Sequence, residues 1–170
     1  MELTENDGLV DIVAEGYDAG VRLHEFVPED MVAVPMGPPL RGLIVGSPDY
    51  LRRRPAPQHP RDLAAHECIR FRFASGHLYK WQFERDGQAL EIDVPGRLTL
   101  CEQGTIVRAV LDGIGLAYVL EDTARSYIES GQMVAVLEDW SEPFAGFALY
   151  YPKQRQMPGA LRAFVDMLRE

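Results

Sequence analysis

The residues that could do chemistry in this sequence are few, and their spacing suits binding better than catalysis. His66, Glu67 and Cys68 are adjacent, but a zinc site needs further ligands at metal spacing and the sequence has no second cluster. The remaining histidines are isolated: His24, His59 and His77. The sequence contains no G-x-S-x-G elbow, no P-loop and no G-x-G-x-x-G fingerprint. We therefore expect no catalytic residues, no metal ion and no cofactor, and the sequence argues against an enzyme.

The most promising binding feature is the start of a predicted helix near Gly104 and Thr105. A strand is predicted over 98–101, the helix runs toward Gly113, and another strand is predicted over 116–120. The first N–H groups of a helix lack partners within it, and its dipole is positive there, so a small anion could dock. A capped, solvated helix start explains the same residues equally well. Both interpretations remain open from the spacing alone.

The segment 11–23 joins a predicted helix to a predicted strand close to the first residue. Leu9, Ile12 and Val13 recur at the spacing of a helix face, and Gly16 suits a left-handed end to that helix. From Tyr17 to Leu23 the apolar residues alternate, which is typical of a half-buried strand. Since a parallel neighbour for this strand would normally precede the helix, we expect the chain to begin within an α/β fold.

Short strands and helices alternate along the rest of the chain. Further strands are predicted over 31–35, 43–45, 79–83, 90–94, 133–137 and 147–151, and further helices begin near residues 48, 60, 122 and 158. Ser47 before Pro48 is expected to cap a helix rather than to contact a ligand. The pair Asp86-Gly87 predicts a hairpin turn.

Composition and charge exclude several functions. The 170 residues are 46% hydrophobic and 25% charged, as in a globular protein of one domain or two small lobes. With 17 Lys and Arg against 26 Asp and Glu, the net charge of -9 would repel a phosphate backbone, so this chain alone should not bind DNA. Cys68 and Cys101 are far apart and form no C-x-x-C pair, which favours reduced thiols in the cytoplasm. No apolar run is long enough to span a membrane, and we expect no membrane partner.

The order of several motifs resembles the effector-binding domain of LysR-type transcriptional regulators, over essentially the whole chain. In order, these motifs are DIVAEGYDAGVRL, MVAVPMGPPLRGLIVGSPDYL, DLAAHECIRFRF, WQFERDG, VPGRLTLCEQGTIVRAVLDGIGLAYVLE, LEDW, ALYYP and LRAFVDMLRE. The resemblance implies an α/β fold like the type 2 periplasmic binding proteins, with mixed sheets and a small-molecule cleft between two lobes. It places residues 1–44 and 148–170 in lobe I and residues 45–147 in lobe II.

The resemblance also implies which family elements this chain lacks. These are the winged helix-turn-helix DNA-binding domain, the linker helix, and the first strand and helix of lobe I. We therefore expect lobe I, and with it the cleft, to be incomplete.

The resemblance carries a set of effector-binding residues over by position: Thr4, Glu5, Cys101, Glu102, Gln103, Gly104 and Thr105. Many relatives have Asn-Asp where this chain has Cys101-Glu102, so a thiol comes near the cleft. We expect that thiol to be buried and inert rather than a redox sensor. Arg22 stands at a position where the family often has arginine, and we expect it to pair with Asp18 rather than to contact ligand.

The function that the resemblance implies is ligand-dependent control of transcription. A small effector, with an anion as one candidate, would bridge the lobes and bias their relative angle. The implied partners are this effector, further copies of the chain in a homodimer or larger homo-oligomer, and DNA through the absent N-terminal domain only. The alternative is a solute-binding protein of a transport system, which would share the fold but carry an export signal.

Overall fold

The computed structural model describes residues 2, 4, 11–153 and 157–169, and the structural statements below concern these residues. The chain divides into two compact units, Met1–Leu40 with Phe144–Glu170, and Arg41–Pro143. Boundaries after residues 44 and 147, as predicted, would fall within the strands β3 (Gly42–Gly46) and β10 (Phe147–Pro152). Each boundary between the two units therefore lies a few residues before its predicted position. That the units are the two lobes of one effector domain stays a prediction.

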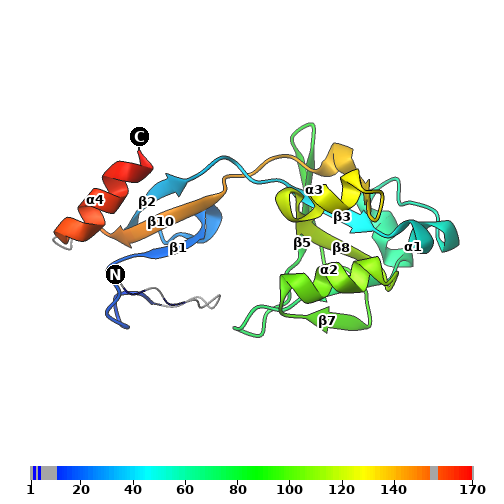
Figure 1. Ribbon diagram of the computed structural model, residues 1–170, viewed down its shortest axis with the longest axis horizontal. Coiled ribbons are helices and arrows are strands. Elements are labelled where there is room, and N and C mark those ends of the chain that lie inside the picture. Colours follow the sequence, from blue (N-terminus) through cyan, green and yellow to red (C-terminus); the bar gives the residue numbers. More distant parts are fainter. Residues whose placement is uncertain (1, 3, 5–10, 154–156, 170) are drawn as a thin grey trace. The chain divides into compact units, whose positions relative to one another are not determined.

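Unit 1 contains a three-stranded antiparallel sheet with one helix packed on it (Figure 1). The strand order is β1 (Gly20–Leu23), β10, β2 (Met31–Met36), and Leu149 of β10 lies between Val21 and Val34. Helix α4 (Gly159–Leu168) presents Val165 to the buried side chains of Val34 and Leu149. The helix predicted to begin near residue 158 therefore forms, and its apolar side chains are part of the core.

The start of unit 1 differs from its prediction. Among the described residues the predicted helix is a single turn, in which the Asp11 carboxylate accepts hydrogen bonds from the N–H groups of Val13 and Ala14. Gly16 does adopt the left-handed conformation, with φ 81°, while Leu9 lies outside the described residues. The strand begins at Gly20 rather than at Tyr17 and pairs antiparallel with β10. The part of the predicted helix before Asp11 lies outside the described residues, so its length stays a prediction.

Unit 2 contains a five-stranded mixed sheet. The strand order is β7 (Leu98–Leu100), β4 (Cys68–Phe71), β8 (Leu116–Leu120), β3, β9 (Val134–Val136). Strands β7, β4 and β8 are parallel, and β3 runs antiparallel to both β8 and β9. Although β2 and β3 are consecutive, they belong to different sheets, so no hairpin joins them.

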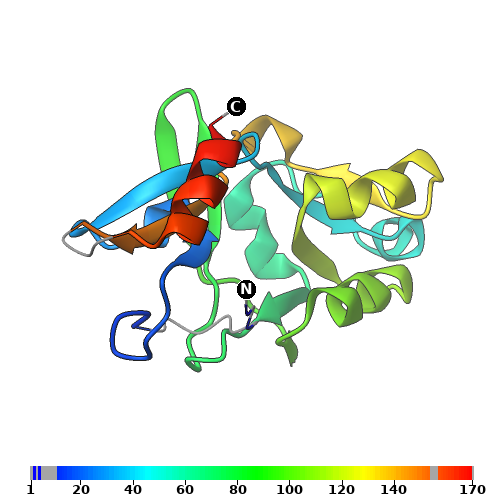
Figure 2. The same ribbon diagram turned by 60° about the vertical axis from the view of Figure 1, so that its left-hand side comes forward.

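The two faces of this sheet carry separate apolar clusters. Helices α2 (Gln103–Leu111) and α3 (Glu121–Glu129) cover one face together (Figure 2), where Ile69 and Ala117 belong to their cluster. The other face packs against α1 (Pro48–Arg53), the hairpin β5 (Trp81–Arg85) and β6 (Gln88–Ile92), and the 3-10 helices Pro60–Ala65 and Glu138–Trp140. Because side chains alternate along a strand, Cys68 and Leu116 point to this second face.

Two local predictions in unit 2 are confirmed. The Ser47 Oγ accepts a hydrogen bond from the Tyr50 N–H at 3.2 Å, which makes Ser47 the N-cap of α1. Asp86 and Gly87 adopt φ 53° and 76°, the two positive values that a tight hairpin turn requires, and the hairpin forms as predicted. In the part of the chain that is described, no helix combines the length and apolar character needed to cross a bilayer.

Candidate functional site

The junction of β7 and α2 places several predicted effector-binding residues together. Glu102 is the N-cap of α2, and its carboxylate turns back onto the start of the helix. Its Oε1 accepts a hydrogen bond from the Gly104 N–H at 2.6 Å, and its Oε2 accepts from the Thr105 N–H at 2.6 Å and from the Thr105 Oγ1 at 2.7 Å. Of the two interpretations that the spacing left open, the structure shows the capped helix start.

This cap changes what the helix start can bind. Hydrogen bonds from the Thr105 hydroxyl and from the N–H groups of Gly104 and Thr105 lower the pKa of Glu102, so its carboxylate is charged at neutral pH. An anion approaching the same N–H groups would meet this charge and would have to displace it. With Glu102 in place, the helix start therefore suits a neutral or hydrogen-bond-donating group better than an anion.

We expect the ionised form of Glu102 to stabilise the fold. Because its folded pKa lies below the ordinary 4.5, the stabilisation is present above pH 4.5 and is lost as the pH falls through the folded value. NMR titration of the side-chain carboxyl should give a pKa below that of an ordinary glutamate.

In urea titrations, Glu102→Gln should be less stable than the unchanged chain at neutral pH, and this difference should shrink on acidification. A difference that stays constant with pH would contradict the ionised cap.

Carboxyl ends of parallel strands form the other notable feature of unit 2. Arg70 lies near the end of β4, pairs with Thr99 of β7, and shares a face with Cys68 by strand alternation. Its Nε is buried and has no hydrogen-bond partner among the described residues. The Tyr79 N–H donates to the Phe71 carbonyl at the end of the same strand. In open α/β sheets, ligands bind outside such carboxyl ends.

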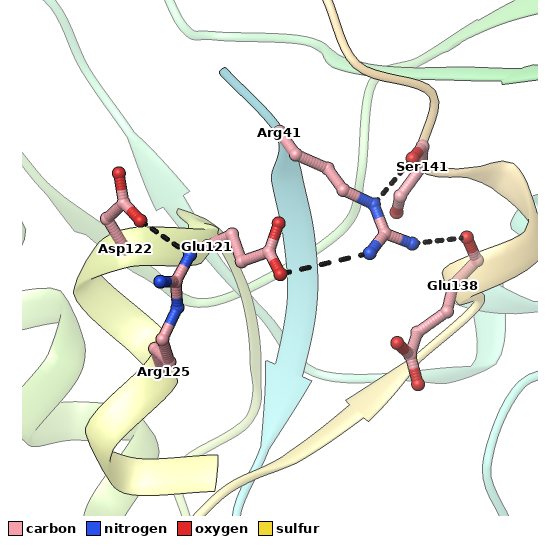
Figure 3. A network of polar contacts seen from close by, with 6 residues as sticks. All are labelled: Arg41, Glu121, Asp122, Arg125, Glu138 and Ser141. Carbon is pink, nitrogen blue, oxygen red and sulfur yellow. Dashed lines mark hydrogen bonds and ion pairs between the residues drawn. The ribbon is translucent and has the colours of Figure 1, made fainter. Parts of the chain in front are cut away.

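A second arginine of unit 2 shows the opposite situation. Figure 3 shows the Arg41 guanidinium among protein acceptors: Nε donates to the Ser141 carbonyl at 2.8 Å and Nη2 to the Glu138 carbonyl at 3.0 Å. The Glu121 carboxylate lies 4.0 Å from Nη1. Arg41 thus connects the first residue of unit 2 to residues near its end, and its hydrogen-bonding capacity is used in holding the fold.

Comparisons with known proteins bear on these features. The family described as LysR substrate binding domain matches residues 1–170. The chain belongs to the LysR substrate-binding domain family. The chain is 43% identical to the uncharacterized HTH-type transcriptional regulator YcaN of Escherichia coli, over 99% of this chain and 55% of that protein. It is 36% identical to the HTH-type transcriptional regulator PgrR of the same organism, over 99% of this chain and 57% of that protein.

Solved structures agree on the fold of this LysR substrate-binding domain. The regulatory domain of the C227S variant of AphB from Vibrio vulnificus superposes with a TM-score of 0.80 at 24% identity, over 99% of this chain and 82% of that one. This likeness confirms the predicted α/β fold with mixed sheets. The chain spans about half the length of the curated relatives that it matches. Because those relatives are transcriptional regulators, the alternative of a transport solute-binding protein is not supported.

The remaining predicted effector residues of the LysR substrate-binding domain are distributed as follows. Gln103 is exposed at the first turn of α2, while Thr4 is exposed and belongs to the other unit. Glu5 lies outside the described residues. The structure therefore brings together the set from Cys101 to Thr105, and the participation of Thr4 and Glu5 stays a prediction.

The prediction of a buried thiol at Cys101 is wrong. Cys101 is exposed, because it follows the last residue of β7 and precedes the helix cap. The buried thiol is Cys68 in β4, and burial raises its pKa to about 12, which leaves it protonated and unreactive at neutral pH.

Arg22 contacts its own sheet. Its Nη1 donates to the Phe26 carbonyl at 3.2 Å, its Nη2 donates to the Tyr150 hydroxyl, and its guanidinium lies 4.3 Å from the centre of the Tyr150 ring. These contacts fix the end of β1 against β10. The predicted pairing of Arg22 with Asp18 stays a prediction.

The residues around His66 form hydrogen bonds with one another that hold the fold. The Tyr50 hydroxyl accepts from the Glu67 N–H at 3.0 Å and lies 3.0 Å from the His66 Nδ1, which can accept its proton. Burial and the nearby Arg54 lower the pKa of His66, which favours its neutral form. Across the described ranges, no group of three or more His, Cys, Asp and Glu side chains is arranged to hold a metal ion.

Proposed function

We propose that this LysR substrate-binding domain binds a small-molecule effector and controls transcription in the full-length protein. The observation that carries this proposal is the family match over residues 1–170, together with relatives that are transcriptional regulators. The domain would act through binding rather than catalysis, and it would do so in the cytoplasm. DNA contact would belong to a part of the protein other than this chain, in keeping with the net charge of -9.

Effector binding would act by favouring one arrangement of the two units. To shift a balanced equilibrium tenfold, the effector must bind one arrangement better by about 1.4 kcal/mol. One or two hydrogen bonds to a charged group are enough for that preference. The effector-binding residues proposed in unit 2 are Cys101, Glu102, Gln103, Gly104 and Thr105, with Thr4 and Glu5 proposed from unit 1.

The test of this site uses the full-length regulator with a reporter gene. Thr105→Trp should abolish the response to effector, because the bulky ring blocks the start of α2, while binding to operator DNA without effector stays unchanged. Arg108→Trp is the matched control, since Arg108 is exposed one turn further along the same helix. A Thr105→Trp regulator that responds like the unchanged protein would refute the site.

We also propose that the domain forms a homodimer or larger homo-oligomer. Light scattering coupled to gel filtration measures the mass directly, and this chain alone has a mass of 19.1 kDa. A mass equal to one chain at micromolar concentration would contradict the proposal for this part of the protein.

A further inference from the structure

An arginine without a protein partner at the end of a parallel strand needs an explanation. Arg70 is partly buried, its Nε is fully buried without an acceptor, and no ion pair joins it to a carboxylate among the described residues. Nine other arginines of unit 2 have carboxylate or carbonyl partners, and the remaining one, Arg61, is exposed to solvent. The nine are Arg41, Arg52, Arg53, Arg54, Arg72, Arg85, Arg97, Arg108 and Arg125. Acidic residues outnumber basic ones, 26 to 17, so a partner for Arg70 would have been easy to supply.

The absence of a partner has a free-energy cost. A buried donor without an acceptor loses its hydrogen bonds to water and gains none in return, and a charged group loses more than a neutral one. Figure 3 shows how the same side chain is satisfied at Arg41, where main-chain carbonyls accept from the guanidinium. Such an arrangement would remove the cost at Arg70, yet the fold does not provide it. A buried polar group without a protein partner is rare in folded proteins, and a bound ion is one arrangement that explains it.

The surroundings of Arg70 fit a ligand with an acidic group and a flat body. Thr99 pairs with Arg70 on β7, and Tyr118 follows Ala117 on β8, on the face that Cys68 and Leu116 share. The rings of Tyr79 and Tyr118 lie 5.3 Å apart in an edge-to-face arrangement and pack against the same cluster. Thr99 therefore lies beside Arg70 on the neighbouring strand, and the Tyr79 ring follows the end of β4. The planar guanidinium matches a carboxylate in shape and charge.

The capped start of α2 strengthens this assignment. Glu102 occupies the N–H groups of Gly104 and Thr105, so the helix start is a poor place for an anion. Arg70 is the cationic group of unit 2 that has a buried nitrogen without an acceptor among the described residues. We propose that Arg70 binds the carboxylate of a small effector, an inference that rests on the proposed effector-binding function.

The experiment measures binding of defined probes to this chain by calorimetry and thermal shift. The probes are benzoate, salicylate and succinate, the neutral amides of the same three acids, and inorganic phosphate. At least one carboxylate should bind and raise the melting temperature, and its amide should bind at least about tenfold more weakly, since a hydrogen bond to a charged group contributes that much or more. Arg70→Gln should weaken the carboxylate by a similar factor. Arg70→Lys should retain part of the affinity, because lysine keeps the positive charge but cannot donate the two parallel hydrogen bonds of a guanidinium group.

Arg97→Gln is the matched control. Arg97 immediately precedes β7, so it lies at the amino end of the strand whose Thr99 pairs with Arg70, and it is exposed. This variant should bind the carboxylate as the unchanged chain does. Without ligand, Arg70→Gln should melt no lower than the unchanged chain, because it removes an unsatisfied charge rather than a contact.

A second measurement does not depend on the stability of the variant. The Nε–H resonance of Arg70, identified by its loss in Arg70→Gln, should shift when the carboxylate is added and stay unchanged when the amide is added. A structural role for Arg70 would not produce this difference between the two probes.

The outcomes separate the two levels of the proposal. If a ligand binds but Arg70→Gln keeps its affinity, or if only phosphate or a neutral probe binds, the carboxylate assignment is overturned while effector binding stands. If none of the probes binds, the carboxylate assignment is overturned as well. Effector binding itself fails only if, in addition, the unchanged full-length regulator shows no response to effector in the reporter assay.

Discussion

Replacing Trp81 with alanine should destabilise the chain by about 3–5 kcal/mol, the range measured for removing a large buried aromatic side chain. Trp81 is 1% exposed and belongs to the second cluster of unit 2, with Leu63, Phe83 and Val94. It is the first residue of β5, so it anchors the hairpin to the sheet, and no neighbouring element can move into the space without giving up its own contacts. Removing the ring would leave a cavity in the cluster that connects the hairpin, α1 and the sheet.

Thermal unfolding followed by circular dichroism measures this effect. At about 2–4 °C per kcal/mol for a chain of this size, the melting temperature should fall by roughly 6–20 °C. Trp81→Phe is the control, because it keeps most of the apolar volume and should lose much less. A loss below about 1 kcal/mol for Trp81→Ala would mean that the hairpin contributes little to the core.

The sequence predicted best the features that depend on a few neighbouring residues. Ser47 before Pro48 and Asp86 before Gly87 act locally, and both behave as predicted because capping and turn formation need no distant contact. The pairing of strands could not be obtained in this way. Nothing near Gly42 indicates that β3 joins a sheet with β8 and β9 while β2 joins β10, because this choice depends on packing between residues that are far apart in sequence.

The candidate site was predictable only in part. The residue types around Gly104 and Thr105 indicated a helix start but did not show whether it is capped. In the structure, the Glu102 carboxylate accepts hydrogen bonds from the N–H groups at that start. The sequence interpretation missed Arg70. A charged residue inside the apolar run CIRF was a signal, but its lack of a partner appears only when the surrounding strands are in place.

Gly96→Ala should be the other strongly destabilising change, by about 3 kcal/mol, because the new methyl group would meet main chain rather than a flexible side chain. A Cβ at residue 96 would lie 1.8 Å from the Cys68 carbonyl oxygen and 3.2 Å from the Cys68 nitrogen. The Cys68 N–H donates to the Pro95 carbonyl at 3.1 Å, so the segment before β7 is fastened to the start of β4. The two segments would have to move apart to accommodate the methyl group. Overpacking of this kind is strongly destabilising.

The same change should also affect binding. The contact at Gly96 lies just before the paired strands β4 and β7, whose register places Thr99 beside Arg70. We therefore expect Gly96→Ala to weaken carboxylate binding as well as to lower the urea midpoint of unfolding. Gly159→Ala is the control: a Cβ there meets nothing within 4 Å, and alanine favours the first turn of α4, so stability should be unchanged or slightly higher. If Gly96→Ala unfolded at the same urea concentration as Gly159→Ala, the close approach of Gly96 to β4 would be refuted.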